Sequence, residues 1–322
     1  MDAPLLEMRR LSVVYRTSGG PVRAVRDVDL TIRKGDIVGI VGESGSGKTS
    51  LVSAIMTLLP PKATIEGQIL FGGRDLYGLD AKQRRALRGN GIATIFQDPF
   101  TAFNPVTPIG RQLVEFQHWR RDLDDGARWR RAEEMLVRVG LGDPGLRMHQ
   151  YPHQLSGGIR QRIGIAAALL TDPLLLIADE PTTALDATTE MQIIELLAEA
   201  RSMVDGAIVF VTHDMALVGA FCDRVAVMYA GELVEVAPVD PAFSALRHPY
   251  SRALLACDPA RLPEGCREFP TIPGHVPAPF ARRSGCIFEP RCGQAAPVCA
   301  TTPPPAVVAG DGSIVRCHRV PA

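Results

Sequence analysis

The chain has 322 residues, a length that suggests about two domains. Hydrophobic residues make up 46% of it and charged residues 22%, a globular composition that argues against a disordered chain. Basic and acidic residues number 35 each, so the formal charge is zero, which disfavours a broad nucleic-acid-binding surface. The first residues lack a signal-peptide pattern, and no stretch has the roughly 18 to 20 apolar residues of a membrane-spanning helix.

The first motif with clear chemistry is a glycine-rich loop between a strand and a helix. Residues 36–41, DIVGIV, predict a buried parallel strand, and a helix is predicted up to Leu59, ahead of two prolines. In such a loop, backbone N–H groups surround a nucleotide phosphate, and the helix N-terminus adds positive potential. Lys48 is expected to reach the β- and γ-phosphates and Thr49 to ligate Mg²⁺. The whole candidate segment is Gly42, Glu43, Ser44, Gly45, Ser46, Gly47, Lys48, Thr49 and Ser50.

Two further apolar runs end in residues that suit phosphate chemistry. Residues 174–178, LLLIA, predict a central strand that leads into Asp179 and Glu180. Because open α/β sheets bind ligands at the carboxyl ends of their strands, Asp179 is expected to hold Mg²⁺ and Glu180 to polarise the attacking water. The third run, residues 207–212, delivers His213, which is expected to touch the γ-phosphate.

A second helix start with anion-binding character lies far from the first. Ser156, Gly157 and Gly158 open an apolar helix that is predicted to reach Leu170. One nucleotide does not need two phosphate-binding helix ends that are about 110 residues apart. We therefore expect the second helix start to serve a nucleotide held by another subunit.

Together these motifs resemble the ATP-binding cassette ATPases of transporters over about residues 5–245. The resemblance implies an α/β, P-loop NTPase cassette fold: a RecA-like core, an antiparallel β subdomain and a helical subdomain at about 98–170. It implies that Tyr15 stacks on adenine, that Gln97 acts in hydrolysis and ligates Mg²⁺, and that Asp186 forms the D-loop. It also implies that Ser156, Gly157, Gly158 and Gln161 act in trans, because two such chains enclose two ATP molecules.

Further segments resemble the oligopeptide/dipeptide importer ATPases: QDPFTAFNPV at 97–106, ADEPTTALD at 178–186, HPYSRALL at 248–255, IPGHVPAP at 272–279 and GCIFEPRC at 285–292. Within that family, IVGIVGESGSGKT at 37–49 resembles the D-type ATPase. This resemblance implies a C-terminal extension over 246–322 and pairing with a second, F-type ATPase. It also implies two transmembrane permease subunits, an extracytoplasmic solute-binding protein and a place at the cytoplasmic face of the membrane. Importers for nickel and other small solutes share much of the pattern. A soluble, non-transport cassette ATPase is the alternative from another class, and it usually has two cassettes or long coiled coils.

The extension carries a set of four cysteines, and three interpretations of it compete. Zinc usually takes thiolates as paired knuckles with short spacing, which this set lacks. A [4Fe-4S] cluster accepts four thiolates with looser spacing, and reduced cysteines can also simply pack. Nearby cations, expected to offset the charge of a cluster, favour the cluster: Arg282, Arg283, Arg291, Arg316, His318 and Arg319. The candidate ligands are Cys286, Cys292, Cys299 and Cys317, whereas Cys222, Cys257 and Cys266 are expected to pack.

Overall fold

The computed structural model describes residues 3–98, 101–183, 185–240, 242–261, 270–278 and 284–321. Contacts divide the chain into two compact units. The first unit comprises Met1–Ile32, Asp36–Gly78 and Phe210–Ala322, and the second comprises Arg33–Gly35 and Leu79–Val209. Strand β8 (Ala207–Thr212), whose bounds match the prediction, crosses the boundary between them. The division of the chain at residue 245 stays a prediction.

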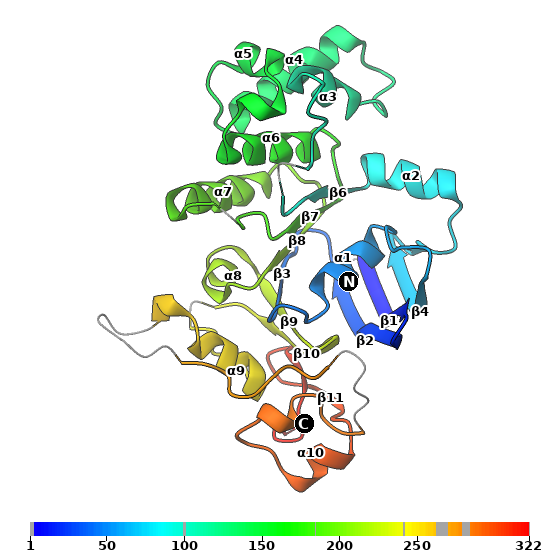
Figure 1. Ribbon diagram of the computed structural model, residues 1–322, viewed down its shortest axis with the longest axis vertical. Coiled ribbons are helices and arrows are strands. Elements are labelled where there is room, and N and C mark those ends of the chain that lie inside the picture. The colour runs from blue at the N-terminus through cyan, green and yellow to red at the C-terminus, as the bar shows by residue number, and fades with distance from the viewer. Residues whose placement is uncertain are drawn as a thin grey trace. The chain divides into compact units, whose positions relative to one another are not determined.

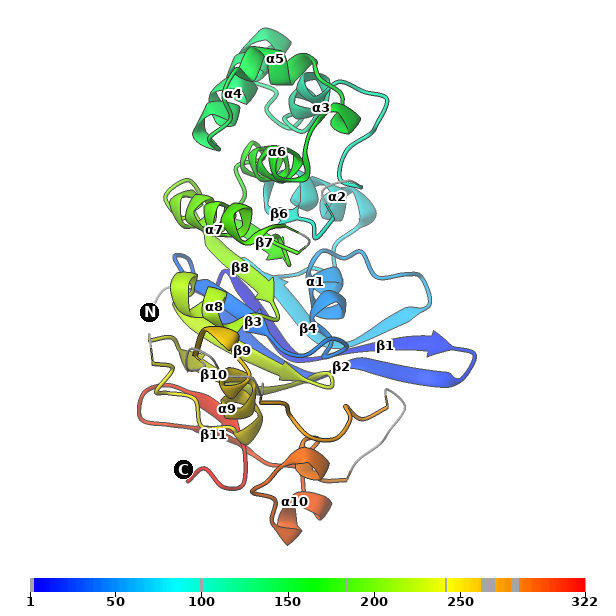
Figure 2. The same cartoon turned by 60° about the vertical axis from the view of Figure 1, so that its left-hand side comes forward.

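The first unit begins with an antiparallel sheet. Strand β1 (Leu6–Thr17) pairs with β2 (Gly20–Ile32) on one side and with β4 (Ala63–Phe71) on the other, and β4 also pairs with the short β5 (Arg74–Asp75). Helix α1 (Lys48–Ile55) contacts β1 and β2, and Figures 1 and 2 both show it beside these strands. This sheet agrees with the antiparallel β subdomain that the sequence led us to expect.

A second group of strands in the first unit carries the phosphate loop. The predicted strand at 36–41 is β3 (Ile37–Val41), which is buried throughout and pairs in parallel with β9 (Arg224–Tyr229). Its β-branched residues suit a strand that is covered on both faces. Strand β9 turns into β10 (Glu232–Pro238), which pairs with it antiparallel, and helix α8 (Met215–Phe221) precedes β9.

The C-terminal extension builds onto the same group of strands. It contains α9 (Pro249–Ala256), α10 (Pro297–Thr301), two short 3-10 turns at Pro259–Arg261 and Glu289–Arg291, and the strands β11 (Ala306–Val308) and β12 (Ile314–Arg316). Strand β12 pairs antiparallel with β10, so that Val315 lies opposite Glu235. The extension is therefore joined to the cassette by backbone pairing, and β11 pairs antiparallel with β12.

The second unit combines a short parallel strand pair with helices. Strands β6 (Ile92–Ile95) and β7 (Leu175–Asp179) pair in parallel. The helices in chain order are α2 (Ala81–Asn90), α3 (Ile109–Glu115), α4 (Asp125–Arg138), α5 (Pro144–His149), α6 (Gly157–Leu169) and α7 (Ala187–Ala200), with a 3-10 turn at Pro152–Gln154. Helices α3, α4 and α5 contact one another and α4 contacts α6, as the expected helical subdomain requires (Figure 1).

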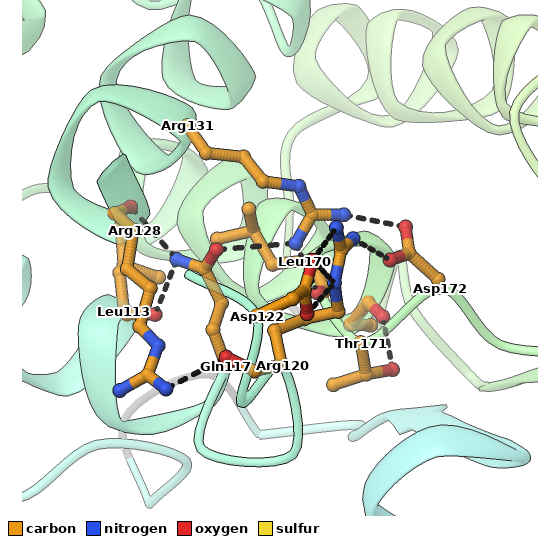
Figure 3. A network of polar contacts seen from close by, with 10 residues as sticks. Leu113, Gln117, Arg120, Asp122, Arg128, Arg131, Leu170, Thr171 and Asp172 are labelled. Atoms are coloured by element: carbon orange, nitrogen blue, oxygen red, sulfur yellow. Dashed lines mark hydrogen bonds and ion pairs between the residues drawn. The ribbon is translucent and has the colours of Figure 1, made fainter. Parts of the chain in front are cut away.

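A network of polar contacts joins these helices (Figure 3). Arg131 on α4 donates to Gln117, to the Leu170 carbonyl just after α6, and to Asp172 at 2.5 Å. Arg120 donates to the same Asp172. Since an arginine has five N–H donors in a rigid plane, it can hold several chain segments in one arrangement.

The predicted helix boundaries need one correction. Helix α1 ends at Ile55 and not at Leu59, because Thr57 takes a left-handed conformation with φ of 53° and breaks the helix ahead of the prolines. Helix α6 ends at Leu169, one residue from the predicted end. None of the helices in the part of the chain that the structure describes is both long and apolar enough to cross a membrane.

Candidate functional site

The phosphate loop follows β3 directly and requires glycine at two positions. Gly47, the residue that caps α1, has a φ of 104°, and a Cβ on it would lie 2.3 Å from the Ala24 carbonyl oxygen. A Cβ on Gly42 would lie 2.1 Å from the Met228 carbonyl oxygen. These close approaches explain why the chain has no side chains at these positions.

Lys48 lies inside the loop that it is predicted to serve. Its Nζ donates to the carbonyls of Gly42 at 2.7 Å and Glu43 at 3.3 Å, and its side chain is buried. The buried hydroxyl of Ser46 has no hydrogen-bond partner among the described residues. Because a buried polar group without a partner costs free energy, this hydroxyl marks a place where a polar ligand fits.

Two other residues predicted to bind ATP meet beside the loop. The hydroxyl of Tyr15 on β1 donates to Oγ of Ser50 on α1 at 3.2 Å. The ring of Tyr15 is half-buried, and it therefore presents some aromatic surface next to the start of α1. His213 follows β8 in an exposed position, and the next residue, Asp214, caps α8 by accepting from the Ala216 backbone N–H.

In the second unit, Glu180 at the end of β7 contacts the predicted glutamine. Gln97 Nε2 donates to Glu180 Oε2 at 3.1 Å, and the hydroxyl of Thr183 donates to the same oxygen at 3.1 Å. Glu180 has a φ of 46°, an uncommon conformation for a residue other than glycine that is often found at functional sites. Asp179 is the last residue of β7. We did not identify Thr183 from the sequence, although it lies in the TTALD segment.

A helix begins at the second segment that is predicted to bind an anion. Ser156 caps α6 by accepting from the Ile159 backbone N–H, and Gly157 and Gly158 form the first turn. Gln161, which is buried, donates to the Pro181 carbonyl at 2.7 Å. A Cβ on Gly158 would lie 2.9 Å from the Thr189 side chain, in the first turn of α7. Asp186, the D-loop residue, caps α7, so the start of α6 and the D-loop are packed together in this unit.

The four candidate cysteine ligands lie within electrostatic reach of one another. The pKa of Cys286 is raised to about 11, mainly by burial, with nearby Cys299 and Cys317 contributing to the increase. Burial, followed by the same two thiols, also raises the pKa of Cys292. Among the described residues, however, no group of three or more His, Cys, Asp or Glu side chains is arranged to hold a metal ion. Among the described residues, the thiols therefore form no site for a single metal ion in this arrangement.

The cations near these cysteines do not all serve them. Arg319 is near enough to lower the pKa of Cys292, but Arg316 donates to the Asp27 carbonyl and His318 contacts the Thr302 carbonyl. Arg291 forms an ion pair with Glu43 of the phosphate loop at 2.8 Å. The expectation that these cations offset a cluster is wrong for Arg291, because its charge is paired with the Glu43 carboxylate. Arg282, Arg283 and Cys266 lie outside the described residues.

Comparison with known proteins identifies the class of protein to which this chain belongs. Residues 25–183 match the ABC transporter family model, and residues 234–299 match the oligopeptide/dipeptide transporter C-terminal region. The ATP-binding cassette MJ0796, in a dimeric post-hydrolysis state bound to ADP and phosphate, is 28% identical over 73% of this chain and 98% of that chain, with a TM-score of 0.65. The structure of cbiO1 from Clostridium perfringens, part of an ABC transporter complex, has a TM-score of 0.63, is 28% identical and covers 75% of this chain and 90% of that chain.

Curated relatives extend over nearly the whole chain. A putative peptide import ATP-binding protein of Brucella abortus is 43% identical over 98% of this chain and 95% of its own length. The dipeptide transport ATP-binding protein DppD of Escherichia coli is 42% identical over 98% and 96%, and the oligopeptide transport ATP-binding protein OppD of Bacillus subtilis is 43% identical over 97% and 88%. The chain therefore belongs to the ATP-binding cassette ATPases of ABC transporters, in the branch with the oligopeptide/dipeptide transporter C-terminal region. The predicted cassette fold and ATPase class are confirmed.

Proposed function

We propose that this chain hydrolyses ATP to energise the import of dipeptides or oligopeptides. The proposal draws on the match to the C-terminal region and on the relatives named for peptide, dipeptide and oligopeptide transport. The identity extends over the whole chain, so both the cassette and the extension carry the likeness. Uptake of a radiolabelled dipeptide and of nickel by vesicles that contain the assembled importer would separate the two solute classes. Uptake of nickel alone would contradict the peptide proposal.

The phosphate loop and α1 hold the triphosphate in this proposal. Backbone N–H groups of residues 44–49 face the phosphates, Lys48 neutralises charge on the β- and γ-phosphates, and the Tyr15 ring stacks on adenine. Mg²⁺, when bound, offsets the charge of the phosphates and orients them. Its proposed ligands are Thr49, Gln97 and Asp179, an all-oxygen donor set of the kind that Mg²⁺ prefers.

Glu180 is the proposed general base, and its two hydrogen-bond donors are the observation that carries this role. Gln97 and Thr183 converge on one oxygen of its carboxylate, which directs the group at the end of β7. A base that is fixed in this way can take a proton from an attacking water. His213 contacts the γ-phosphate in this proposal. The signature residues Ser156, Gly157, Gly158 and Gln161, with Asp186 beside them, serve the ATP held by a second ATPase.

The substitution Glu180→Gln tests the base. The amide keeps the shape of the side chain but cannot accept a proton, so we expect ATP turnover to fall by at least ~100-fold while ATP-bound dimers accumulate. Glu195→Gln is a matched control, because Glu195 is an exposed acid on α7. Near-normal turnover by Glu180→Gln, or an equal loss in the control, would remove Glu180 from this role.

The proposed assembly contains a second, F-type ATPase and two permease subunits, with an extracytoplasmic binding protein that delivers solute. The ATPases sit at the cytoplasmic face of the membrane and have no nucleic-acid partner. Affinity purification of this chain from detergent-solubilised membranes tests the assembly. Recovery of two polytopic proteins and a second cassette protein would support it, whereas recovery of this chain alone from the soluble fraction would count against it.

The four-cysteine set is proposed to hold a [4Fe-4S] cluster, with zinc as the alternative. Cys286 and Cys292 both lie near Cys299 and Cys317, which supports a cluster, and thiols with raised pKa values, such as Cys286 and Cys292, require a cationic partner to ionise at neutral pH. Iron, acid-labile sulfide and zinc measured in anaerobically purified protein would decide the matter. About four irons and four sulfides per chain, lost in Cys292→Ser, would establish the cluster. One zinc or no metal would make this segment a structural brace.

A further inference from the structure

Arg291 of the C-terminal extension is held against the phosphate loop. Its Nη1 donates to Oε2 of Glu43 at 2.8 Å and its Nη2 donates to Oε1 of Glu43 at 3.2 Å. This is a bidentate arginine–carboxylate pair, the geometry that gives the strongest and most directional ion pairs. The Arg291 side chain is only 4% exposed, so little water competes for these hydrogen bonds.

The remaining donors of Arg291 fix the guanidinium in place. Nε donates to the Pro273 carbonyl at 2.8 Å, Nη2 also donates to the Ile272 carbonyl at 3.0 Å, and Nη1 also donates to the Tyr229 hydroxyl at 3.3 Å. These contacts and the two to Glu43 make five hydrogen bonds, which use all five N–H donors of an arginine. A lysine, with three donors and no planar fork, cannot reproduce this arrangement.

Glu43 is also fixed through its backbone. Its N–H donates to the Tyr250 hydroxyl on α9 at 3.0 Å. Its carbonyl accepts from the backbone N–H of Ser46 at 3.1 Å and from Nζ of Lys48 at 3.3 Å. The extension therefore holds Glu43 at two points, and the carbonyl of the same residue contacts the lysine that is expected to bind phosphate.

Aromatic packing holds the two tyrosines that contact Arg291 and Glu43. Tyr229 and Tyr250 have ring centroids 4.6 Å apart, and Phe288, three residues ahead of Arg291, lies against both rings at 5.2 and 5.3 Å. The side chains of Tyr229, Tyr250 and Phe288 are buried. The two hydroxyls that contact Arg291 and Glu43 are thus part of a packed cluster that cannot shift without disturbing the extension.

We propose that Arg291 is a positioning residue of the ATP site, which acts through Glu43 to hold the phosphate loop and Lys48 in the conformation that binds ATP. This inference rests on the proposed phosphate-binding role of residues 42–49. It gives the C-terminal extension a direct part in nucleotide binding. The extension then does more than lengthen the sheet, and its segment 272–274 is held in place by the same guanidinium.

The test is ATP binding by the full-length chain, measured with a fluorescent ATP analogue. We expect Arg291→Met to weaken binding about 5- to 30-fold, within the range typical of coupling between sites. Arg291→Lys is expected to recover only part of this loss because the planar fork is missing. Arg247→Met is the matched control: Arg247 pairs with Asp311 at 2.8 Å within the extension and does not contact the loop. Its binding should equal that of the wild type.

Two further measurements distinguish positioning of the phosphate loop by Arg291 from a general stabilisation of the extension. Hydrogen–deuterium exchange of the peptide that spans 42–49 should increase in Arg291→Met and stay unchanged in Arg247→Met. In a double-mutant cycle, adding Arg291→Met to Glu43→Gln should weaken ATP binding by less than about twofold further, because both changes break the same contact. Additive losses, or equal effects of Arg291→Met and Arg247→Met, would overturn the proposal.

The same ATP-binding assay also tests the proposed phosphate-binding role of the loop. If the wild type binds ATP and Lys48→Ala does not, the loop is the phosphate site, and wild-type affinity in Arg291→Met then refutes the positioning role alone. If Lys48→Ala binds as tightly as the wild type, the loop is not the phosphate site, and both proposals fail.

Discussion

Gln97 and Glu180, 83 positions apart in the chain, meet in the second unit with 3.1 Å between Nε2 of the amide and Oε2 of the carboxylate. Thr183 adds a second donor to the same oxygen. Two donors that converge on one oxygen fix the direction of the carboxylate, as a general base requires. The left-handed backbone at Glu180, with a φ of 46°, brings the side chain out of the strand direction of β7.

Removal of the Thr183 hydroxyl should lower turnover without abolishing it. Thr183→Val keeps the side-chain volume but leaves Gln97 as the donor to Oε2 of Glu180. We expect ATP turnover to fall about tenfold, a part of the roughly 10²- to 10⁴-fold that a positioned base supplies. Thr188→Val, in the exposed first turn of α7, should have no effect. Steady-state phosphate release checks both, and equal losses would show that Thr183 does not act through Glu180.

Two glycines of the phosphate loop should respond differently to alanine. Gly45 has a φ of 79° with open space around its Cβ position, whereas Gly47 has a φ of 104° and a carbonyl oxygen 2.3 Å from that position. Gly45→Ala should lower the free energy of unfolding by about 1–2 kcal/mol, the cost of a left-handed alanine. Gly47→Ala should lower it further and weaken ATP binding. Urea unfolding of both variants measures this difference, and equal effects would show that the Ala24 carbonyl moves away easily.

His248 should make stability depend on pH below neutrality. It is 1% exposed, its Nδ1 accepts from the Tyr250 N–H, and burial lowers its pKa from 6.5 to about 4. A lowered histidine pKa means that the unfolded chain takes up a proton before the folded chain does. The stability from this group is therefore present above about pH 6.5 and is lost as the pH falls toward 4. At pH 4 the loss is about 3 kcal/mol.

The measurement is the free energy of unfolding between pH 7 and pH 4.5, compared between the wild type and His248→Gln. The variant should be less stable at pH 7 but should lose less stability on acidification. His118→Gln removes an exposed histidine on the short turn after α3 and should follow the wild-type curve. A His248→Gln curve that runs parallel to the wild type would contradict a buried neutral imidazole.

The polar network of the helical region should contribute to its stability. Arg131→Met removes the hydrogen bonds to Gln117, Leu170 and Asp172. It leaves the side-chain amide oxygen of the buried Gln117 without this donor. Because the ion pair is partly exposed, we expect a loss of about 1–2 kcal/mol in the free energy of unfolding. Arg111→Met breaks an exposed pair with Glu115 on α3 and should cost less than about 0.5 kcal/mol. Urea unfolding followed by circular dichroism compares the two.

Continuous motifs were the predictable part of this molecule. Strand β3, the loop and α1 are consecutive in the chain, and so are β7 with Asp179 and Glu180, so the local sequence was enough to predict these elements and their order. The end of α1 could not be predicted from the sequence, because the left-handed Thr57 breaks the helix before the two prolines. Residue type at Thr57 gives no signal for this conformation.

Contacts between distant segments could not be read from spacing. Glu43 and Arg291 are 248 positions apart, and nothing in either local sequence indicates the other as a partner. Arg291 is adjacent to Cys292 in the sequence, which suggested that its charge would offset a cluster bound by the cysteines. In the structure its side chain instead contacts Glu43 of the phosphate loop. The pairing of β12 with β10 is equally non-local, because three-residue strands carry too few residues to show a period.

The order in which this chain is synthesised affects when its ATP site can form. The phosphate loop leaves the ribosome early, but the arginine that holds Glu43 follows 248 residues later, and β12, which pairs with β10, comes later still. A chain cut short before residue 291 would contain every nucleotide motif and yet lack the contact that orders its loop. Under the proposed positioning role, maturation of the ATP site is thus tied to synthesis of the C-terminal extension.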